Sequence, residues 1–149
     1  MGKKKIIWFI VLLVVAIGGL YAYKEYTRTN KDLTKVKADI QITAVALVKE
    51  YETNDSSANN KYSGRVLEIV GMVKDIQKDD GNYTLVLGDT AVMSSVRCSM
   101  DSVHQQDAAL LIVGSSATVR GICTGFNKDE MGLGSDVILN RCVIIRNKK

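Results

Sequence analysis

Three cysteines and one histidine are the residues of this chain best suited to metal binding or nucleophilic chemistry. They are Cys98, Cys123, Cys142 and His104, and no two of the cysteines form a CxxC pair. Zinc sites need Cys and His ligands clustered at short spacings, so the pattern predicts no metal site. No Ser/His/Asp grouping, phosphate-binding loop or carboxylate pair accompanies His104, which is expected at the surface. The sequence therefore predicts neither a catalytic centre nor a cofactor, and the protein is expected not to be an enzyme.

Two of the cysteines, Cys123 and Cys142, lie in apolar segments that are expected to form neighbouring antiparallel strands. A connecting loop centred on residues 131–134 would place the two thiols almost opposite each other. One interpretation is a pair of buried free thiols that fill a small core. The other is a disulfide, which requires an oxidising compartment. Cys98 lies in an alternating segment and is expected to pack in the core.

Acidic side chains gather in two turn-like segments, 77–82 and 127–135. They are Asp79, Asp80, Asp129 and Glu130, and Tyr83 follows directly after the first segment. Carboxylate oxygens are the ligands that Ca²⁺ prefers, but neither segment has the spacing of an EF-hand loop. Both segments are therefore expected to be solvated turns.

An uncharged stretch of eighteen residues, Ile6–Tyr23, dominates the N-terminal part of the chain. Its length is near the lower limit for crossing a hydrocarbon layer of about 30 Å. Lys3–Lys5 precede it, and Trp and Tyr side chains flank both of its ends, as is typical of membrane interfaces. Because basic clusters stay in the cytoplasm, residues 1–28 are predicted to be an anchor that crosses a bacterial inner membrane once. The C-terminal domain is then expected to be periplasmic.

A cleaved signal peptide is the alternative for the same stretch, because Ala16, Gly18 and Ala22 offer a weak cleavage site. The apolar run is longer than the usual signal-peptide core, which favours the uncleaved anchor. Cleavage would leave a soluble periplasmic domain. No cysteine lies in or just after the stretch, so a lipoprotein anchor is not predicted.

Residues 29–62 are predicted to form an amphipathic helix and a linker. Within Asp32–Glu52, apolar residues recur at spacings of three and four. They are Leu33, Val36, Ile40, Ala44, Leu47, Val48 and Tyr51. The polar segment 54–60, NDSSANN, breaks this pattern. We expect the helix to pack on the following domain. A dimerising coiled coil is the alternative, although fewer than three heptads make it weak.

Residues 63–149 contain five segments with the pattern of β-strands. They are Arg65–Gln77, Tyr83–Leu87, Val92–Met100, Ser116–Phe126 and Asp136–Arg146, and Ser102–Val113 between the third and fourth is expected to be a short helix or loop. Gly71 and Gly121 lie inside strands, where a glycine often marks a sharp bend. Five bent strands with a helical connection describe an OB fold, whereas a sandwich needs about seven strands. The predicted fold is mainly β: a five-stranded OB-fold barrel preceded by an amphipathic helix and an N-terminal transmembrane helix.

Ligands of OB folds lie on the second and third strands, flanked here by the segments 77–82 and 127–135. The candidate residues of this ligand face are Asp79, Asp80, Tyr83, Asp129 and Glu130. Residues 63–149 contain ten basic and ten acidic side chains, and the basic excess of four charges lies in residues 1–62. An acidic rim repels phosphates, and the face has few rings on which bases could stack. Nucleic-acid binding is therefore disfavoured.

Three stretches of the sequence suggest a family. Ala44–Val73 resembles the helix-then-strand entry of the tRNA-anti-like OB-fold proteins of Bacteroidetes-type bacteria, and VRGICTG at Val119–Gly125 and DVILNRCVI at Asp136–Ile144 resemble their last two strands. The resemblance covers about Ile42–Ile145. It implies a fold similar to the anticodon-binding domain of aminoacyl-tRNA synthetases, without an established activity. Many members look like lipoproteins, whereas this chain has an apolar helix without a lipobox cysteine.

These observations predict a membrane-tethered, non-catalytic OB-fold module for binding or scaffolding that faces the periplasm. Its expected partner is a protein or another envelope component, in addition to the membrane itself. The alternative function is an OB-fold binder of single-stranded nucleic acid or oligosaccharide.

Overall fold

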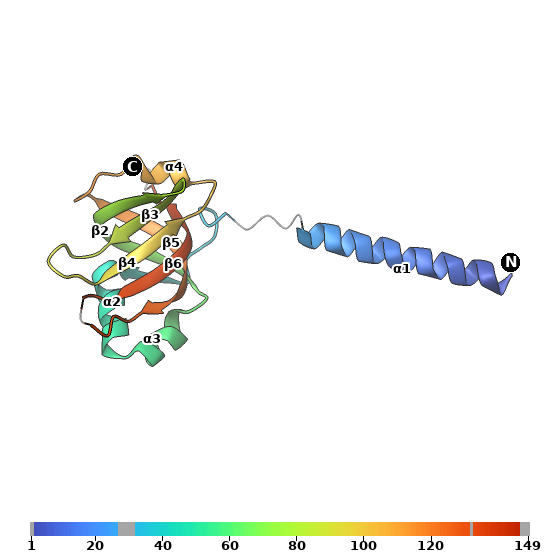
Figure 1. Ribbon diagram of the computed structural model, residues 1–149, viewed down its shortest axis with the longest axis horizontal. Helices are drawn as coiled ribbons and strands as arrows, with labels where there is room; N and C mark the ends of the chain where they lie inside the picture. The colour runs from blue at the N-terminus through green and yellow to red at the C-terminus, as the bar shows by residue number, and fades with distance from the viewer. Residues whose placement is uncertain (1, 27–31, 132, 147–149) are drawn as a thin grey trace. The chain divides into compact units, whose positions relative to one another are not determined.

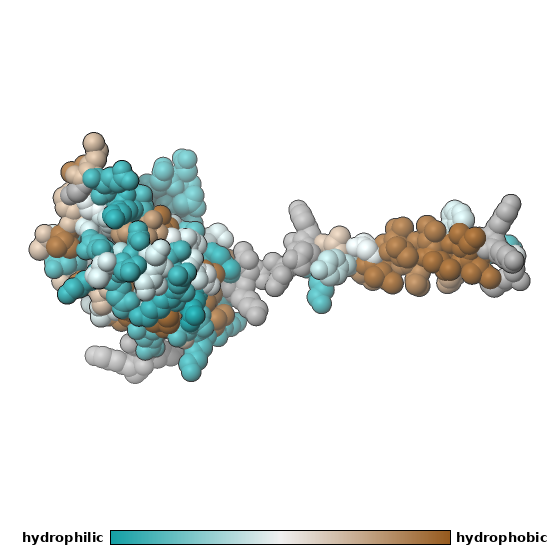
Figure 2. All heavy atoms as spheres, turned by 90° about the horizontal axis from the view of Figure 1, so that it is seen from below, coloured by the Kyte–Doolittle hydropathy of each residue, from teal (hydrophilic) through white to brown (hydrophobic). Residues whose placement is uncertain are grey.

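The computed structural model describes residues 2–26, 32–131 and 133–146, and the chain divides into two compact units, 1–31 and 32–149. The first unit contains helix α1, Lys3–Tyr26 (Figure 1). Within it, the 20 residues Lys5–Lys24 are long and apolar enough to cross a membrane. Figure 2 shows apolar side chains along this helix, and none of that stretch is buried. Apolar residues on all sides are typical of a helix that lipid or protein surrounds. The prediction of an apolar N-terminal helix is confirmed.

The second unit contains six strands and three helices among its described residues (Figure 1). The strands are β1 Ile40–Thr43, β2 Val66–Asp79, β3 Asn82–Leu87, β4 Ser95–Met100, β5 Ser116–Asn127 and β6 Asp136–Ile144. The helices are α2 Ala44–Thr53, α3 Asp55–Tyr62 and α4 Gln105–Ala108. The expected short helix or loop over 102–113 is thus present, with α4 as its helical turn.

The strands pair in the order β1-β2-β3-β4-β6-β5, and β5 also pairs with β2 over Val66–Met72. The long strand β2 therefore contributes its first half to β5 and its second half to β3. β4 and β6 run parallel, whereas β2–β3, β3–β4 and β5–β6 are antiparallel. This arrangement confirms the mainly β, OB-type fold. The sheet has six strands and not the predicted five, because β1 pairs in parallel with β2.

Strand β1 corrects the helix predicted over 32–52, which begins only at Ala44. Residues 40–43, IQIT, pair with Leu67–Val70, and their β-branched side chains at alternate positions suit a strand as well as a helix. The side chain of Thr43 ends the strand and caps α2, because its Oγ1 accepts a hydrogen bond from the Ala46 amide at 3.2 Å.

Helix α3 corrects the linker predicted over 54–60. Asn54 does not break the structure but caps this second helix, since its side-chain oxygen accepts from the Ser57 amide at 2.9 Å. The helix buries Ala58 and Tyr62, and the Tyr62 ring lies 6.0 Å from that of Tyr51 between centroids. Residues 32–62 therefore share one core with the sheet, and the compact unit begins at Asp32.

Two strand glycines permit close packing in this core. A Cβ atom at Gly71 would lie 2.8 Å from Cβ of Ala44, so the glycine allows α2 to approach β2. A Cβ atom at Gly121 would overlap Sγ of Cys142 on the neighbouring strand β6. The sequence predicted bends at these positions, and the structure adds that neighbouring atoms leave no space for a side chain.

The third sequence-predicted strand begins later than expected, at Ser95 and not at Val92. The ammonium group of Lys74 on β2 donates to the carbonyl oxygens of Val92 at 2.7 Å and Ser94 at 3.2 Å. These bonds to a side chain hold the residues before Ser95 in a turn, outside the strand ladder.

Candidate ligand-binding site

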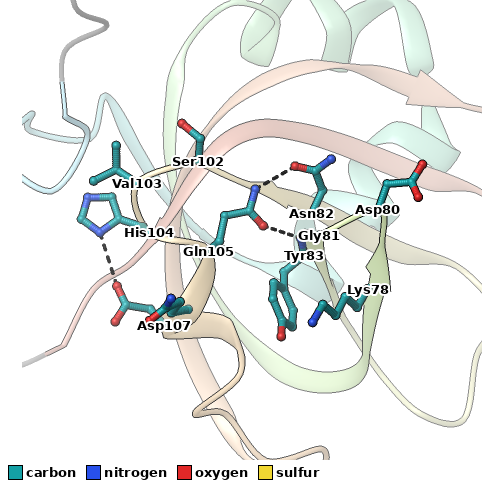
Figure 3. Close-up of a pocket in the computed structure, with 11 residues that line it drawn as sticks. Lys78, Asp80, Gly81, Asn82, Tyr83, Ser102, Val103, His104, Gln105 and Asp107 are labelled. Atoms are coloured by element: carbon teal, nitrogen blue, oxygen red, sulfur yellow. Dashed lines mark hydrogen bonds and ion pairs between the residues drawn. The ribbon is translucent and has the colours of Figure 1, made fainter.

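A polar hollow of about 680 Å³ lies between the β2–β3 hairpin and the segment 102–107, which includes most of α4 (Figure 3). The hairpin turns at Asp80 and Gly81, whose φ angles of 45° and 83° are both left-handed. Asp-Gly is a sequence well suited to this turn, because both residues tolerate positive φ. The sequence thus predicted the hairpin edge of the hollow correctly.

Gln105 joins the two sides of the hollow. Its side-chain oxygen accepts from the Tyr83 amide at 2.6 Å, and its side-chain nitrogen donates to Oδ1 of Asn82 at 2.9 Å. Figure 3 shows Gln105 between these two residues of β3. These two hydrogen bonds connect the hairpin to α4. Nothing in the sequence spacing indicated this contact, which joins residues 22 and 23 positions apart.

His104, which the sequence places at the surface, is partly exposed beside the hollow and lies between two carboxylates. Its Nε2 is 3.2 Å from Oδ1 of Asp32, and its Nδ1 is 3.3 Å from Oδ2 of Asp107. Asp107 also pairs with Arg146 at 3.0 Å. The amide of Thr34 is the main cause that lowers the pKa of Asp32, and His104 adds to this effect. Among the described residues, the His104 ring contacts these two carboxylates and no nucleophile. The Asp32–His104–Asp107 group therefore resembles a structural contact between segments.

Several polar groups of the hollow have no internal partner. The side chains of Asp80, Ser102 and Gln106 form no hydrogen bond with any residue that the structure describes. The ammonium group of Lys78 lies 5.3 Å from the centroid of the Tyr83 ring. These groups are available to a ligand, and together they offer both hydrogen-bond donors and acceptors.

The five sequence-predicted residues of the ligand face divide between opposite ends of β4. Asp79 pairs with Asn82 in the hairpin, so Asp79, Asp80 and Tyr83 lie at the end where β4 finishes. Asp129 and Glu130 precede Asp136, which pairs with Ser95 where β4 begins. Asp129 accepts from the amides of Met131 at 2.9 Å and Leu133 at 2.7 Å, so its carboxylate organises its own loop. The sequence predicted the two loops, and of these two it is the loop 77–82 that lines the hollow.

An apolar surface accompanies the Asp129 loop. Its exposed side chains come from α2, from the turn before β4 and from the loop before β6. They are Val45, Val92, Met93, Met131 and Leu133. A hydrogen-bonded frame supports these segments: Ser94 Oγ donates to Glu52 at 2.5 Å and accepts from the Ser135 amide at 3.1 Å. Val45 and Val92 line one hollow of about 420 Å³, and contiguous exposed apolar side chains are typical of interaction surfaces.

Arg97 lies in the middle of β4, between these two ends. Its guanidinium group donates to Oε1 of Gln77 at 2.5 Å and lies 3.7 Å from the Asp136 carboxylate. The charge of Arg97 is therefore already partly neutralised.

The three cysteines are buried free thiols. Cys123 lies opposite Leu139, so Cys142 is three positions further along β6. The Cys123 thiol and the Tyr51 hydroxyl form a hydrogen bond of 3.3 Å, whereas the Cys142 thiol contacts Cys98. The structure therefore does not contain the Cys123–Cys142 disulfide, because the register separates the two residues. Burial is the main cause that raises the pKa of both Cys123 and Cys142.

Within the described ranges 2–26, 32–131 and 133–146, no three His, Cys, Asp or Glu side chains group in a way that could hold a metal ion.

The strand order, the hairpin and the helical segment beside it together define an OB-fold domain. The chain belongs to the tRNA_anti-like family, whose model matches residues 1–143. A comparison with curated proteins found no match.

Solved structures with the same fold include a candidate nucleic acid-binding lipoprotein from Klebsiella pneumoniae subsp. pneumoniae. It is 16% identical, with a TM-score of 0.55 over 71% of this chain and 92% of that one. An OBody bound to hen egg-white lysozyme is 12% identical, with a TM-score of 0.44 over 59% of this chain and 88% of that one. Asparaginyl-tRNA synthetase of Entamoeba histolytica is 13% identical, with a TM-score of 0.41, and the match covers 58% of this chain but 22% of the synthetase. At 16% identity, the Klebsiella structure supports the fold alone.

Proposed function

We propose that this chain is a membrane-tethered, non-catalytic OB-fold module that binds a partner on the far side of a bacterial inner membrane. The observation that carries the proposal is the combination of the apolar stretch Lys5–Lys24 with a compact unit, 32–149, that has two candidate binding surfaces. One surface is the polar hollow beside Asp80, and the other is the apolar surface around Met93. The fold positions both surfaces on rigid, hydrogen-bonded supports.

The proposed orientation follows from charge. Lys3–Lys5 precede the apolar stretch, and basic clusters of this kind remain in the cytoplasm. The domain after residue 31 is then periplasmic. Removal of the apolar segment by a signal peptidase is the alternative, which would release the same domain as a soluble periplasmic protein.

The contacts of the histidine and cysteine side chains support a non-catalytic role. His104 is held between Asp32 and Asp107, and the thiols of Cys123 and Cys142 are buried with raised pKa values. None of these groups lies with an activated nucleophile beside it in the described part of the chain. Binding of a protein or another envelope component is therefore the better use of the two surfaces.

Reporter fusions test the tether and its orientation. Alkaline phosphatase fused after residue 149 should be active, and a fluorescent protein that matures only in the cytosol should be dark at the same position. The intact mass of the membrane-extracted chain should include residues 1–31. An inactive phosphatase fusion would reject the orientation, and a product that lacks the first unit would establish the cleaved form.

A second candidate function is binding of single-stranded nucleic acid, which the OB-fold family and the description of the Klebsiella relative favour. The charges of this chain favour it less. Arg97 contacts Gln77 and Asp136, and Arg120 pairs with Glu68, so these cations already have acidic or polar partners. Titration of labelled DNA and RNA single strands at low salt decides between the two functions. Saturable micromolar binding that weakens steeply with salt would favour the nucleic-acid binder.

A further inference from the structure

We propose that the hollow between the β2–β3 hairpin and α4 binds a neutral saccharide. This inference rests on the proposed function of a binding module and names the class of ligand for one of its two surfaces. The hollow, of about 680 Å³, falls within the range of roughly 300–1,000 Å³ that is usual for ligand sites.

The exposed polar groups of the hollow suit a ligand that both donates and accepts hydrogen bonds. Asp80 offers a carboxylate acceptor, whereas Gln106 and Ser102 each offer a donor and an acceptor, and none of these three side chains has a partner in the described residues. Hydroxyl groups of a saccharide donate and accept at each oxygen. A ligand rich in hydroxyl groups therefore satisfies the mixed set better than one with acceptors only.

The charges of the hollow favour a neutral ligand. Lys78 is the cation that lines it, while Asp80 and Asp107 line it as carboxylates. Arg146 lies 3.0 Å from Asp107, so that carboxylate is already paired. Because these charges almost balance, the hollow would attract a polyphosphate chain only weakly. The unpaired carboxylate of Asp80 would also repel it.

Part of the hollow is organised before any ligand arrives. The side-chain nitrogen of Gln105 donates to Oδ1 of Asn82 at 2.9 Å. This hydrogen bond directs the two N–H groups of the Asn82 amide away from Gln105. Figure 3 shows Ser102 and Gln105 on the segment that contains α4, and Asn82, Asp80 and Lys78 on the hairpin. Fixed donors reduce the loss of conformational freedom when a ligand binds.

Stacked bases and apolar peptides fit this hollow less well. Tyr83 is the aromatic residue among the side chains that line it, and the ammonium group of Lys78 lies over that ring. Single-strand binders use successive rings as stacking platforms. Peptide grooves rely on apolar pockets, whereas most side chains of this hollow are polar.

Calorimetric titration of the full chain in lipid nanodiscs tests the proposal. The probes are chitotetraose and maltotetraose, with a tetra-alanine peptide and a four-nucleotide thymidine strand as comparisons. The test variant is Asp80→Gly with Gln106→Ala, because glycine keeps the left-handed turn at residue 80. The control is Asp55→Asn, which changes an exposed carboxylate at the start of α3, outside the hollow.

At least one saccharide should bind saturably to the wild-type chain, the double variant should weaken that binding at least about tenfold, and the control should leave it unchanged. Absence of binding by both saccharides, with circular dichroism showing a folded domain, would overturn the proposal. Equal affinity in the double variant would also overturn it. Peptide or nucleotide binding that the double variant removes would reject the saccharide class and leave the binding module intact.

Discussion

Replacement of Arg120 by methionine should destabilise the OB-fold unit more than the loss of any exposed ion pair. The guanidinium group on β5 lies 2.5 Å from Oε2 of Glu68, and the two side chains are 13% and 15% exposed. Its Nη1 also donates to the carbonyl oxygens of Leu33 at 3.0 Å and Val36 at 2.6 Å. Arg120 thus fastens the first residues of the compact unit to the sheet.

The magnitude follows from what remains after the substitution. Removal of one partner from a buried ion pair costs about 3–5 kcal/mol. Here Gln41 still donates to Glu68 at 3.0 Å, and partial exposure admits water, so the lower part of that range applies. We expect Arg120→Met to lower the free energy of unfolding by about 3 kcal/mol. The double variant Arg120→Met with Glu68→Met should be less destabilised than the single variant, because no uncompensated carboxylate remains.

Urea unfolding of the fragment 32–149, followed by circular dichroism, measures these differences. The matched control is Arg146→Met, whose side chain is 63% exposed and pairs with Asp107. Exposed pairs contribute about 0–1 kcal/mol, so this control should change stability little. If Arg120→Met costs no more than Arg146→Met, the reasoning about the buried pair is refuted. If the double variant has a lower free energy of unfolding than Arg120→Met, the role assigned to the unpaired carboxylate is refuted.

Three further predictions concern other contacts in the same unit. Gly121→Ala should lower the free energy of unfolding by about 1–3 kcal/mol, because the new methyl group overlaps the Cys142 thiol. Adding Cys142→Ala should recover part of that loss, which a double-mutant cycle of urea unfolding measures. If the effects of the two substitutions simply add, the overlap is refuted. Alkylation of denatured, unreduced protein should label Cys98, Cys123 and Cys142 alike, and a pair of cysteines protected until reduction would contradict the free thiols. Lys61 and Tyr62 lower the pKa of Glu50 below its ordinary value of 4.5, so its contribution to stability is complete above that value and is lost as the pH falls through the lowered pKa. The difference in unfolding free energy between the wild-type fragment and Glu50→Gln should therefore shrink in acid, and a difference that is constant from pH 7 to pH 3 would contradict the assignment.

Local patterns in the sequence were sufficient for most of the sheet. The alternation of the strands, the Asp80-Gly81 turn and the uncharged N-terminal stretch each depend on neighbouring residues, and each is found as expected apart from the later start of β4 at Ser95. The segment 40–43 was misassigned because its two isoleucines fit both a helical and a strand period. Only pairing with β2, a contact across 27 positions, favours the strand.

The candidate site depends on distant contacts and could be predicted only in part. Asp80 and Tyr83 were recognised from the turn and from the OB fold. Gln105 and His104 were not, because their partners Asn82 and Asp32 are 23 and 72 positions away. Likewise, the register between β5 and β6 shifts on both sides of Cys123, and this shift decided which thiols meet. Irregular pairing of this kind has no simple periodic signal in the sequence.

The position of β6 between β4 and β5 determines when the domain can complete its fold during synthesis. Strand β6, residues 136–144, pairs with both β4 and β5. Until β6 has been synthesised, one edge of β4 and one edge of β5 therefore stay unpaired. The hairpin β2–β3 and the helices α2 and α3 form from earlier residues, but the sheet cannot be completed before residue 144 has emerged from the ribosome. A chain that crosses a membrane in extended form would therefore remain unfolded, and competent for export, until nearly all of its domain has been made.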